Sequence, residues 1–335
     1  MNKMDKFDLL DLFYENANEN ENQYISGETI AAKFGITRAA VWKAVADLKK
    51  WGYNIESKTN NGYRLSKSFD ILNEYEIKSK LKKRGLDFDV IYKQSTGSTN
   101  DDAKKPAVEN SGKNMIIAAG ELTAARGRYG RSFSAQEGGV YITLKICRPN
   151  DFFNVDSITF YPLIAAAATS RAVYDLCGID LHIKWPNDLL HGDANAGYKK
   201  LCGILTEASF QAEHRDISYI IVGIGVNVNA DGFEGELSNI ASSLRIISGQ
   251  VFDRADLICA IADNFMRLAN SSREYLLEEY KKRLLTGIAI SFAQNGNEYK
   301  GIAQSINENG NLLARINNGS GETLITVQSS EINFI

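Results

Sequence analysis

A helix–turn–helix pattern followed by a short hairpin, in residues 28–65, constrains the fold of this chain most strongly. Residues 28–34 are expected to form a short helix that Gly35 ends, because glycine tolerates the left-handed backbone found after helices. Thr37 is a suitable N-cap for a second helix that continues to about Trp51. Four apolar residues recur at helical spacing in this second helix and form its expected buried stripe: Val41, Ala44, Val45 and Leu48.

Two short strands, at residues 55–58 and 63–65, are expected on either side of the turn sequence Asn60-Asn61-Gly62. Acids outnumber bases by seven to three in residues 1–36, whereas bases outnumber acids by seven to two in residues 37–67. This basic segment on a helix–turn–helix and hairpin indicates a winged-helix domain whose second helix enters the major groove of DNA. The residues expected to face DNA lie off the buried stripe: Arg38, Trp42, Lys43, Lys49 and Arg64. A helical protein-interaction module is the alternative, and partial burial is an equal alternative for Trp42.

Length and composition limit the remaining possibilities. A chain of 335 residues is long enough for two or three domains. No apolar run approaches the roughly 20 residues that cross a bilayer, and the first ten residues lack the apolar core of a signal peptide. The four cysteines are widely spaced and form no Cys-x-x-Cys pair, so neither a zinc site nor a disulfide scaffold is indicated. We therefore expect a cytoplasmic protein with no membrane partner.

The segment Arg126-Gly127-Arg128-Tyr129-Gly130-Arg131 places three arginines and two glycines within six residues. Glycine lets the backbone approach a ligand closely, and the planar guanidinium groups suit phosphates and carboxylates. The segment predicts a loop that binds a polyanion, with a solvated basic turn as the alternative.

Three further polar motifs lie at the ends of expected strands. Ser98-Thr99-Asn100 offers either a helix N-cap or several neutral hydrogen-bonding groups. Lys184-Trp185-Pro186-Asn187-Asp188 brings together groups that suit a phosphate, a base edge and a metal ion or water, with a polar β-turn as the alternative. Lys200 stands at the start of a strand. The glycine-spaced strand at 223–229 lacks the third glycine and the following helix of a dinucleotide fingerprint, so its glycines are expected to let a ligand or a neighbouring strand approach.

In their order and approximate spacing, these motifs resemble those of the biotin protein ligases. The resemblance covers nearly the whole chain, and it rests on 98–100, 126–131, 184–188, 200–205, 225–227 and 241–244. With its N-terminal winged helix, the chain is similar to the bifunctional form, the biotin operon repressor. The implied fold is α+β: a winged helix-turn-helix domain at 1–66, a class II aminoacyl-tRNA-synthetase-like mixed sheet with helices at 67–285, and a small Src-homology-3-like β-barrel at 286–335. Short strands at 289–292, 298–306, 312–316 and 323–327 fit the barrel.

The resemblance implies a biotin–[acetyl-CoA-carboxylase] ligase that works in two steps. Biotin and ATP, with Mg²⁺, form biotinyl-5′-AMP, and a lysine of the biotin carboxyl carrier protein of acetyl-CoA carboxylase then takes the biotin. Biotinyl-5′-AMP also acts as corepressor, favouring a homodimer that binds operator DNA of biotin biosynthesis and transport genes.

The resemblance also assigns roles to residues. Biotin-binding residues are Ser98, Thr99, Asn100, Leu122, Arg126, Gly127, Arg128 and Lys200. ATP- or adenylate-binding residues are Arg126, Arg128, Lys184, Asn187, Asn227 and Phe233. Catalytic residues are Arg128, Lys200, Lys184 and Asp188, of which Asp188 is also the candidate Mg²⁺ ligand. Both nucleophiles come from substrates, so these side chains are expected to neutralise the two anions and stabilise the charged transition state.

Two departures from the family pattern stand next to the Arg/Gly segment. Leu122 occupies a position where the family usually has a glutamine that contacts biotin, and Ala125 replaces a usual glycine. Because the glutamine amide at position 122 is lost, with one expected hydrogen bond to the ligand, we expect weaker biotin binding. A ligand-sensing transcription factor that no longer catalyses, and a lipoate ligase of related fold, are the alternatives. Lys200, Arg128 and the complete 184–188 motif argue against the first, and the Arg/Gly segment and the N-terminal domain disfavour the second.

Overall fold

The computed structural model describes residues 6–19, 23–66, 70–105, 112–128, 134–147, 159–210, 217–317, 319, 321–327 and 331–335. Tyr129, Gly130 and Arg131 of the Arg/Gly segment lie outside these residues. The chain divides into two compact units, Met1–Glu76 and Ile77–Ile335. Across the described residues, no helix combines the length and the apolar character needed to span a bilayer. All four cysteines are free.

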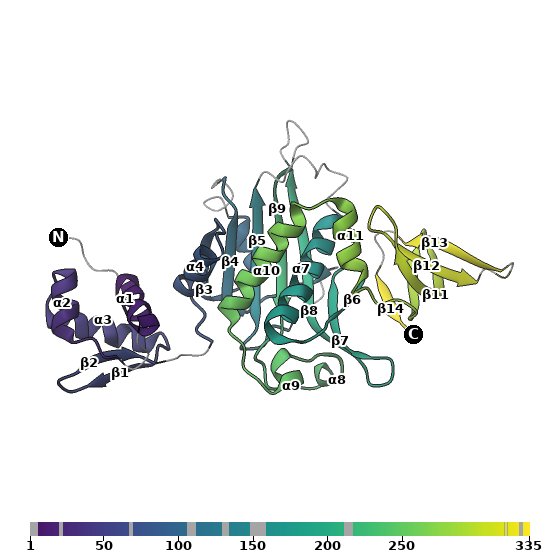
Figure 1. Ribbon diagram of the computed structural model, residues 1–335. Helices are drawn as coiled ribbons and strands as arrows, with labels where there is room; N and C mark the ends of the chain where they lie inside the picture. The colour runs from purple at the N-terminus through teal and green to yellow at the C-terminus, as the bar shows by residue number, and fades with distance from the viewer. Residues whose placement is uncertain are drawn as a thin grey trace. The chain divides into compact units, whose positions relative to one another are not determined.

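The first unit contains three helices and a two-stranded antiparallel sheet (Figure 1). Its elements are α1 (Lys6–Glu19), α2 (Gly27–Phe34), α3 (Arg38–Lys50), β1 (Ile55–Lys58) and β2 (Gly62–Leu65). Gly35 ends α2 with a φ of 64°, and the Thr37 hydroxyl caps α3 by accepting from the Ala40 amide at 3.2 Å. The predicted helix–turn–helix and hairpin are confirmed, whereas α1 was not predicted.

Helix α3 divides into a buried and an exposed face. Val41, Val45 and Leu48 are buried as predicted, and they form a core with apolar residues of α1, while Ala44 is half-buried. The side chains expected to face DNA from α3 are exposed: Arg38, Trp42, Lys43 and Lys49. Trp42 is 66% exposed, which excludes partial burial as its main role in this unit.

The compact first unit extends to Glu76, past the predicted boundary at residue 66. The hydroxyls of Tyr14 and Tyr53 each donate to Glu76 Oε1 at 2.8 Å. Tyr75 also belongs to the buried core of this unit. Because these contacts join residues far apart in sequence, residue spacing alone does not reveal them.

Arg64 of the hairpin, predicted to face DNA, is held by neighbours within the unit. Its guanidinium donates to Glu56 Oε2 at 2.7 Å and lies 5.0 Å from the centre of the Tyr24 ring. Ser66 and Tyr24 also donate to the Glu56 carboxylate, at 2.6 and 2.7 Å. Hydrogen bonds from Ser66, Tyr24 and Arg64 lower the pKa of Glu56 to about 2.

We expect Glu56→Gln to flatten the acid dependence of the first unit's stability. The pKa of Glu56 is depressed on folding from about 4.5, so its contribution is present above that value and is lost as the pH falls toward 2. Hydrogen-exchange protection of residues 55–66 should therefore decline across this range in the natural protein and change less in the variant. Glu28→Gln, at an exposed carboxyl of the same unit, is the control. Equal pH dependence of the natural protein and the Glu56 variant would contradict the assignment.

The second unit is built on a seven-stranded mixed sheet in the order β3-β4-β5-β9-β8-β7-β6. Its strands are β3 (Asp89–Thr96), β4 (Met115–Leu122), β5 (Val140–Cys147), β6 (His182–Lys184), β7 (Asp188–Asp193), β8 (Gly197–Phe210) and β9 (Ile217–Val226). Strands β3 and β4 are parallel, and the other neighbours are antiparallel.

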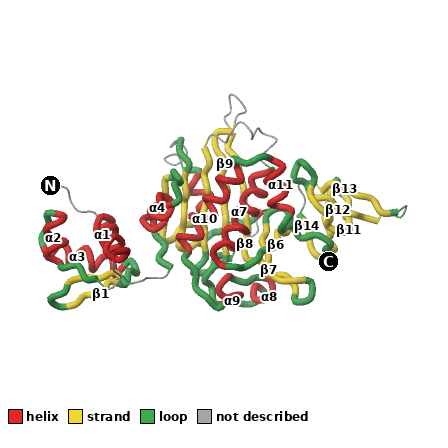
Figure 2. The backbone as a smooth tube through the Cα atoms, viewed as in Figure 1, coloured by secondary structure: helices red, strands yellow, loops and turns green. Residues whose placement is uncertain are grey.

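Seven helices of the described residues accompany this sheet. They are α4 (Glu74–Lys83), α5 (Thr99–Ala103), α7 (Phe160–Cys177), α8 (Leu237–Ile240), α9 (Leu244–Ser248), α10 (Arg254–Ala269) and α11 (Arg273–Lys281). Two of them, α5 and α7, lie between strands of this sheet in the chain. Figure 2 shows α7, α10 and α11 lying across one face of the sheet, with α7 packed on both other helices. The four consecutive alanines of α7, 165–168, are buried, which confirms the predicted close packing of a small-residue helix.

Five antiparallel strands near the C-terminus form a second sheet in the order β13-β12-β11-β10-β14. They are β10 (Ala289–Gln294), β11 (Asn297–Ile306), β12 (Leu312–Asn317), β13 (Glu322–Val327) and β14 (Ile332–Phe334). The four predicted strands are confirmed, and β14 is additional. The predicted closed barrel is not confirmed, because β13 and β14 are the edges of an open sheet in the described residues. The Trp185 indole donates to the Gly310 carbonyl at 2.9 Å and so joins the two sheets of this unit.

Candidate functional site

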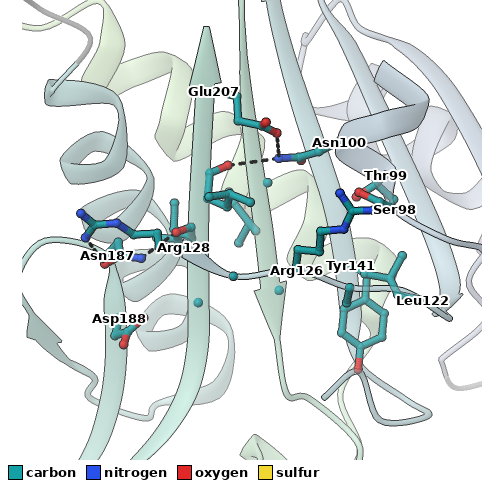
Figure 3. Close-up of a pocket in the computed structure, with 18 of the residues that line it drawn as sticks. Ser98, Thr99, Asn100, Leu122, Arg126, Arg128, Tyr141, Asn187, Asp188 and Glu207 are labelled. Atoms are coloured by element: carbon teal, nitrogen blue, oxygen red, sulfur yellow. Dashed lines mark hydrogen bonds between the residues drawn. The ribbon is translucent and has the colours of Figure 1, made fainter. Parts of the chain in front are cut away.

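A cavity of about 260 Å³ lies in the second unit where β4, β7, β8, β9 and the start of α5 meet (Figure 3). Most of the side chains predicted from the sequence line it: Ser98, Thr99, Asn100, Leu122, Arg126, Gly127, Arg128, Lys184, Asn187, Asp188 and Lys200. These residues come from segments more than 100 positions apart in the chain. The tertiary structure thus brings the separate motifs to one site.

Two predicted nucleotide-binding residues do not line this cavity. Asn227 is buried just after β9, where its amide nitrogen donates to the Ser242 carbonyl at 3.1 Å. Its side-chain oxygen is also buried and has no hydrogen-bond partner among the described residues. Phe233 is half-exposed in the segment between β9 and α8. Their nucleotide-binding roles stay predictions.

The cationic part of the cavity contains two residues on adjacent strands that pair with each other. Lys200 Nζ lies 2.7 Å from Asp188 Oδ1. The register of β7 and β8 shifts between Leu189 and Leu190. As a result, Leu190 is paired with Lys200, while Asp188 is paired with Gly203. Because strand side chains alternate in direction, this one-residue bulge puts Lys200 on the same face as Asp188. The irregularity in the strand therefore assembles the pair.

Arg128 and Lys184 are oriented by other contacts. Arg128 Nη1 donates to Asn187 Oδ1 at 3.3 Å, and Asn187 Nδ2 donates to the Ile204 carbonyl at 2.7 Å (Figure 3). Lys184 Nζ lies 4.8 Å from the centre of the Phe334 ring of β14. Glu331 and Ile332 of the same C-terminal segment line the cavity. The second sheet thus contributes to the site, and sequence reasoning, which gave it a supporting role, missed these contacts.

The opposite part of the cavity contains the hydroxyls of Ser98 and Thr99, with the charged side chain of Arg126 beside them. Ser98 caps α5, since its hydroxyl accepts from the Asp101 amide at 3.3 Å. This confirms the capping interpretation, and Ser98 lines the cavity as well. Figure 3 shows Ser98 and Thr99 near the Arg126 side chain, with Leu122 and Tyr141 beside them.

The Asn100 side chain packs against β9 at a position where only glycine leaves room for it. It is 6% exposed, and a Cβ at Gly223 of β9 would lie 2.4 Å from Asn100 Oδ1. A ligand or a neighbouring strand was predicted to approach the glycines of this strand, whereas the group that approaches Gly223 is the Asn100 side chain of α5. Thr143 and Glu207, which hydrogen-bond to Asn100, were not predicted as site residues.

A buried carboxylate fixes the helix that carries these residues. Asp102 of α5 accepts from Thr96 at 2.7 Å, and Lys93 and Lys105 lie within 2.7 Å of its other oxygen. Burial alone raises the pKa of Asp102, but the hydrogen bonds from Lys105, Lys93 and Thr96 outweigh it and hold this pKa below its ordinary value. Asp102 therefore stays ionised and ties α5 to the end of β3.

The cavity offers one carboxylate at the predicted Mg²⁺ position, Asp188. In the part of the chain that the structure describes, no three His, Cys, Asp or Glu side chains cluster in a way that would enclose a metal ion. Mg²⁺ often uses only one or two protein carboxylates and takes its other ligands from water and phosphate oxygens. The donor set around Asp188 therefore fits a nucleotide-bound Mg²⁺ and does not fit a permanent metal centre.

Comparisons with known proteins show which families this chain resembles. Residues 11–64 match the model of an HTH domain, and residues 91–227 match the model of the Biotin/lipoate A/B protein ligase family. "Bifunctional ligase/repressor BirA" from Bacillus subtilis (strain 168) is 35% identical over 323 residues, which is 93% of this chain and 94% of that protein. The protein of the same name from Bacillus spizizenii is 38% identical over 254 residues, or 75% of this chain and 74% of that protein.

One solved structure is similar to most of this chain. The biotin protein ligase from Aquifex aeolicus, in complex with biotin and ATP, has a TM-score of 0.60 to this chain at 25% sequence identity. The match covers 74% of this chain and 99% of that one.

Proposed function

Because the chain belongs to the family of bifunctional biotin ligases and helix-turn-helix repressors, we propose that it activates biotin as biotinyl-5′-AMP and transfers it to a carrier-protein lysine. The acceptor is proposed to be the biotin carboxyl carrier protein of acetyl-CoA carboxylase. The observation that carries the proposal is one cavity that has the hydroxyls of Ser98 and Thr99 in one part and the cations Arg128 and Lys200 in another. A ligand with a polar head and an anionic tail suits such a cavity.

The cationic end fits the charge that develops during adenylation. The biotin carboxylate and the triphosphate repel each other, and Arg126, Arg128 and Lys200 supply positive donors that hold them together. As the carboxylate attacks the α-phosphate, negative charge grows on phosphoryl oxygens, and fixed cations stabilise that state more than the ground state. Asp188 would hold Mg²⁺, which neutralises charge on the leaving pyrophosphate.

The second step needs no nucleophile from this chain. The acceptor lysine amine attacks the acyl carbon of biotinyl-5′-AMP, an amide bond forms, and AMP leaves. We propose that the segment 230–239, with Phe233, covers the adenylate and limits its hydrolysis.

The first unit gives the proposal its regulatory part. Exposed basic residues on α3 suit the phosphates and base edges of a DNA major groove. We propose that the adenylate acts as corepressor and favours a homodimer, because a two-fold dimer matches two operator half-sites. The target genes would be those for biotin synthesis and transport.

Incubation with biotin, ATP, Mg²⁺ and a biotin carboxyl carrier domain, followed by streptavidin blotting, tests the enzymatic proposal. We expect ATP-dependent labelling of the carrier lysine and none with a carrier whose lysine is replaced. Lipoate in place of biotin is the control for the related ligase activity. Transfer of lipoate but not biotin would overturn the proposal.

Leu122→Gln is expected to strengthen biotin binding. Leu122 lines the cavity with an apolar side chain beside the polar groups of 98–100. A glutamine amide there would add one hydrogen bond, with a net effect of roughly 0.5–1.5 kcal/mol, or about 2- to 12-fold in Kd. Calorimetric titration of biotin into both proteins measures the change, with Leu122→Met as the apolar control. Unchanged affinity in Leu122→Gln would show that position 122 does not contact the ligand head.

A further inference from the structure

A chain of hydrogen bonds links Glu207 on β8 to Thr99 in the cavity. Asn100 Nδ2 donates to Glu207 Oε2 at 2.8 Å (Figure 3). On its other side, Asn100 Oδ1 lies 2.6 Å from Thr143 Oγ1 of β5, which in turn lies 2.8 Å from Thr99 Oγ1. Thr143, Thr99 and Asn100 are 0%, 5% and 6% exposed, so water has little access to compete for these bonds.

The Glu207 carboxylate, at one end of this series of hydrogen bonds, fixes the orientation of the Asn100 amide. Glu207 Oε1 accepts from Lys104 at 2.6 Å, so both carboxylate oxygens face donors. An ionised carboxylate only accepts, and the Leu205 carbonyl, 3.3 Å from Asn100 Nδ2, also only accepts. Asn100 must therefore present its NH₂ group to Glu207 and its oxygen to Thr143.

The orientation of Asn100 then determines whether the hydroxyls of Thr143 and Thr99 donate or accept. The amide oxygen only accepts, so the single hydroxyl hydrogen of Thr143 must point to it. Thr143 Oγ1 is left as the acceptor in its contact with Thr99, and the Thr99 hydroxyl must donate to it. Thr99 Oγ1 then has only lone pairs left to offer a ligand.

The hydroxyl of Ser98, the neighbour of Thr99, has the opposite hydrogen-bonding role toward the cavity. Its hydroxyl oxygen already accepts from the Asp101 amide at 3.3 Å, which leaves its hydrogen to donate. The two adjacent residues thus present one acceptor and one donor to the cavity they line. This pair matches a ring edge that carries an N–H next to a carbonyl, as a cyclic urea does.

We propose that Glu207 is a positioning residue that fixes Thr99 as a hydrogen-bond acceptor for a ring N–H of the ligand, acting through Asn100 and Thr143. The proposal rests on the proposed function, in that the ligand is biotin. Gly223 keeps the Asn100 amide in place, because only a residue without a Cβ leaves room for it. Specificity for a donor at this position is then set by a carboxylate that also lines the cavity and reaches Thr99 through two intervening side chains.

The test compares biotin with two carbamate analogues, each with one ring N–H replaced by oxygen. Calorimetry gives a Kd for each ligand. We expect the natural protein to prefer biotin by about 10-fold or more over one analogue, the one that sets oxygen against the lone pairs of Thr99. Thr143→Val interrupts the series of hydrogen bonds and frees the Thr99 hydroxyl to donate to the ligand. The preference for biotin over this analogue should therefore fall to about 3-fold or less. Thr143→Ser keeps the hydroxyl and should keep the preference.

Glu207→Gln tests the carboxylate itself. The glutamine has one side-chain oxygen, which Lys104 attracts, so its NH₂ group turns toward Asn100 and favours the reversed amide. The preference for biotin should fall here as well. In Lys104→Met/Glu207→Gln the glutamine oxygen is free to face Asn100, and the preference should return, whatever the absolute affinity.

The ratio of affinities separates this role from a structural one. Loosened packing weakens biotin and the analogues together and leaves the ratio unchanged. An unchanged ratio in either Thr143→Val or Glu207→Gln would overturn the proposal, and in Glu207→Gln it would show that the Leu205 carbonyl suffices to orient Asn100. Failure of the natural protein to discriminate between biotin and both analogues would overturn it too. If the natural protein binds no biotin at all, the proposed function itself fails.

Discussion

Lys200→Met is expected to lower the rate of biotinyl-5′-AMP formation by about 100- to 1000-fold, the size of effect seen when one preorganised donor to a developing anion is removed. Lys200 lines the cavity and lies 2.7 Å from Asp188, so its ammonium group has a fixed position between the strands. Methionine keeps much of the side-chain length and removes the charge. The variant should therefore lose the stabilisation of phosphoryl charge while the sheet stays intact.

Pyrophosphate release in single-turnover conditions measures this step apart from transfer to the carrier. Lys199→Met is the matched control, because Lys199 is the adjacent residue, is exposed and donates to the Ser238 carbonyl at 3.0 Å, outside the cavity lining. Lys200→Arg keeps the charge with a different geometry and should retain part of the rate. Arg128→Met is then added to Lys200→Met. An undiminished rate in this double variant would rule out electrostatic stabilisation by these two groups.

Arg38→Ala/Lys43→Ala is expected to weaken operator binding by about 10- to 100-fold and to reduce the slope of log affinity against log salt by about 2. Both side chains are exposed on α3, the second helix of the helix–turn–helix. Each loses about one phosphate contact with its displaced counterion. Trp42→Ala should act differently, because a 66% exposed indole carries no charge and should change sequence preference with little change in the salt slope.

Fluorescence anisotropy on labelled operator DNA at several salt concentrations measures both quantities. Lys281→Ala/Lys300→Ala removes the same charge from exposed positions of the second unit and is the control for net charge. Equal effects of the two double variants would place DNA binding outside α3. Arg64→Ala is expected to act indirectly, since Arg64 is already bound to Glu56.

The sequence predicted those parts of the fold that depend on neighbouring residues. Gly35 and Thr37 place the turn of the helix–turn–helix, because a left-handed C-cap and a hydroxyl N-cap are local hydrogen-bonding requirements. The exposed face of α3 follows from its 3.6-residue repeat. Helix α1 and strand β14 were missed, since the burial that stabilises them comes from distant partners: Phe13 packs in the core of the first unit, and Phe334 lies against Lys184.

The chemical types of the site residues were also present in the sequence, whereas their arrangement was not. The motifs around Ser98, Arg128, Asp188 and Lys200 predicted a polyanion site and a polar subsite, and the structure brings these residues to one cavity. Whether Asp188 meets Lys200 depends on a bulge in β8, and a one-residue shift in register would turn that lysine to the other face.

The sequence by itself thus determined which residues carry charge and hydrogen-bonding groups, because these are properties of single side chains and short motifs. Only the tertiary structure decided which of them act together and in which direction, as Glu207 does on Thr99 through two buried intermediates. The physical reason is that hydrogen-bond direction and ion pairing depend on distances of a few ångströms between strands, and sheet register sets those distances.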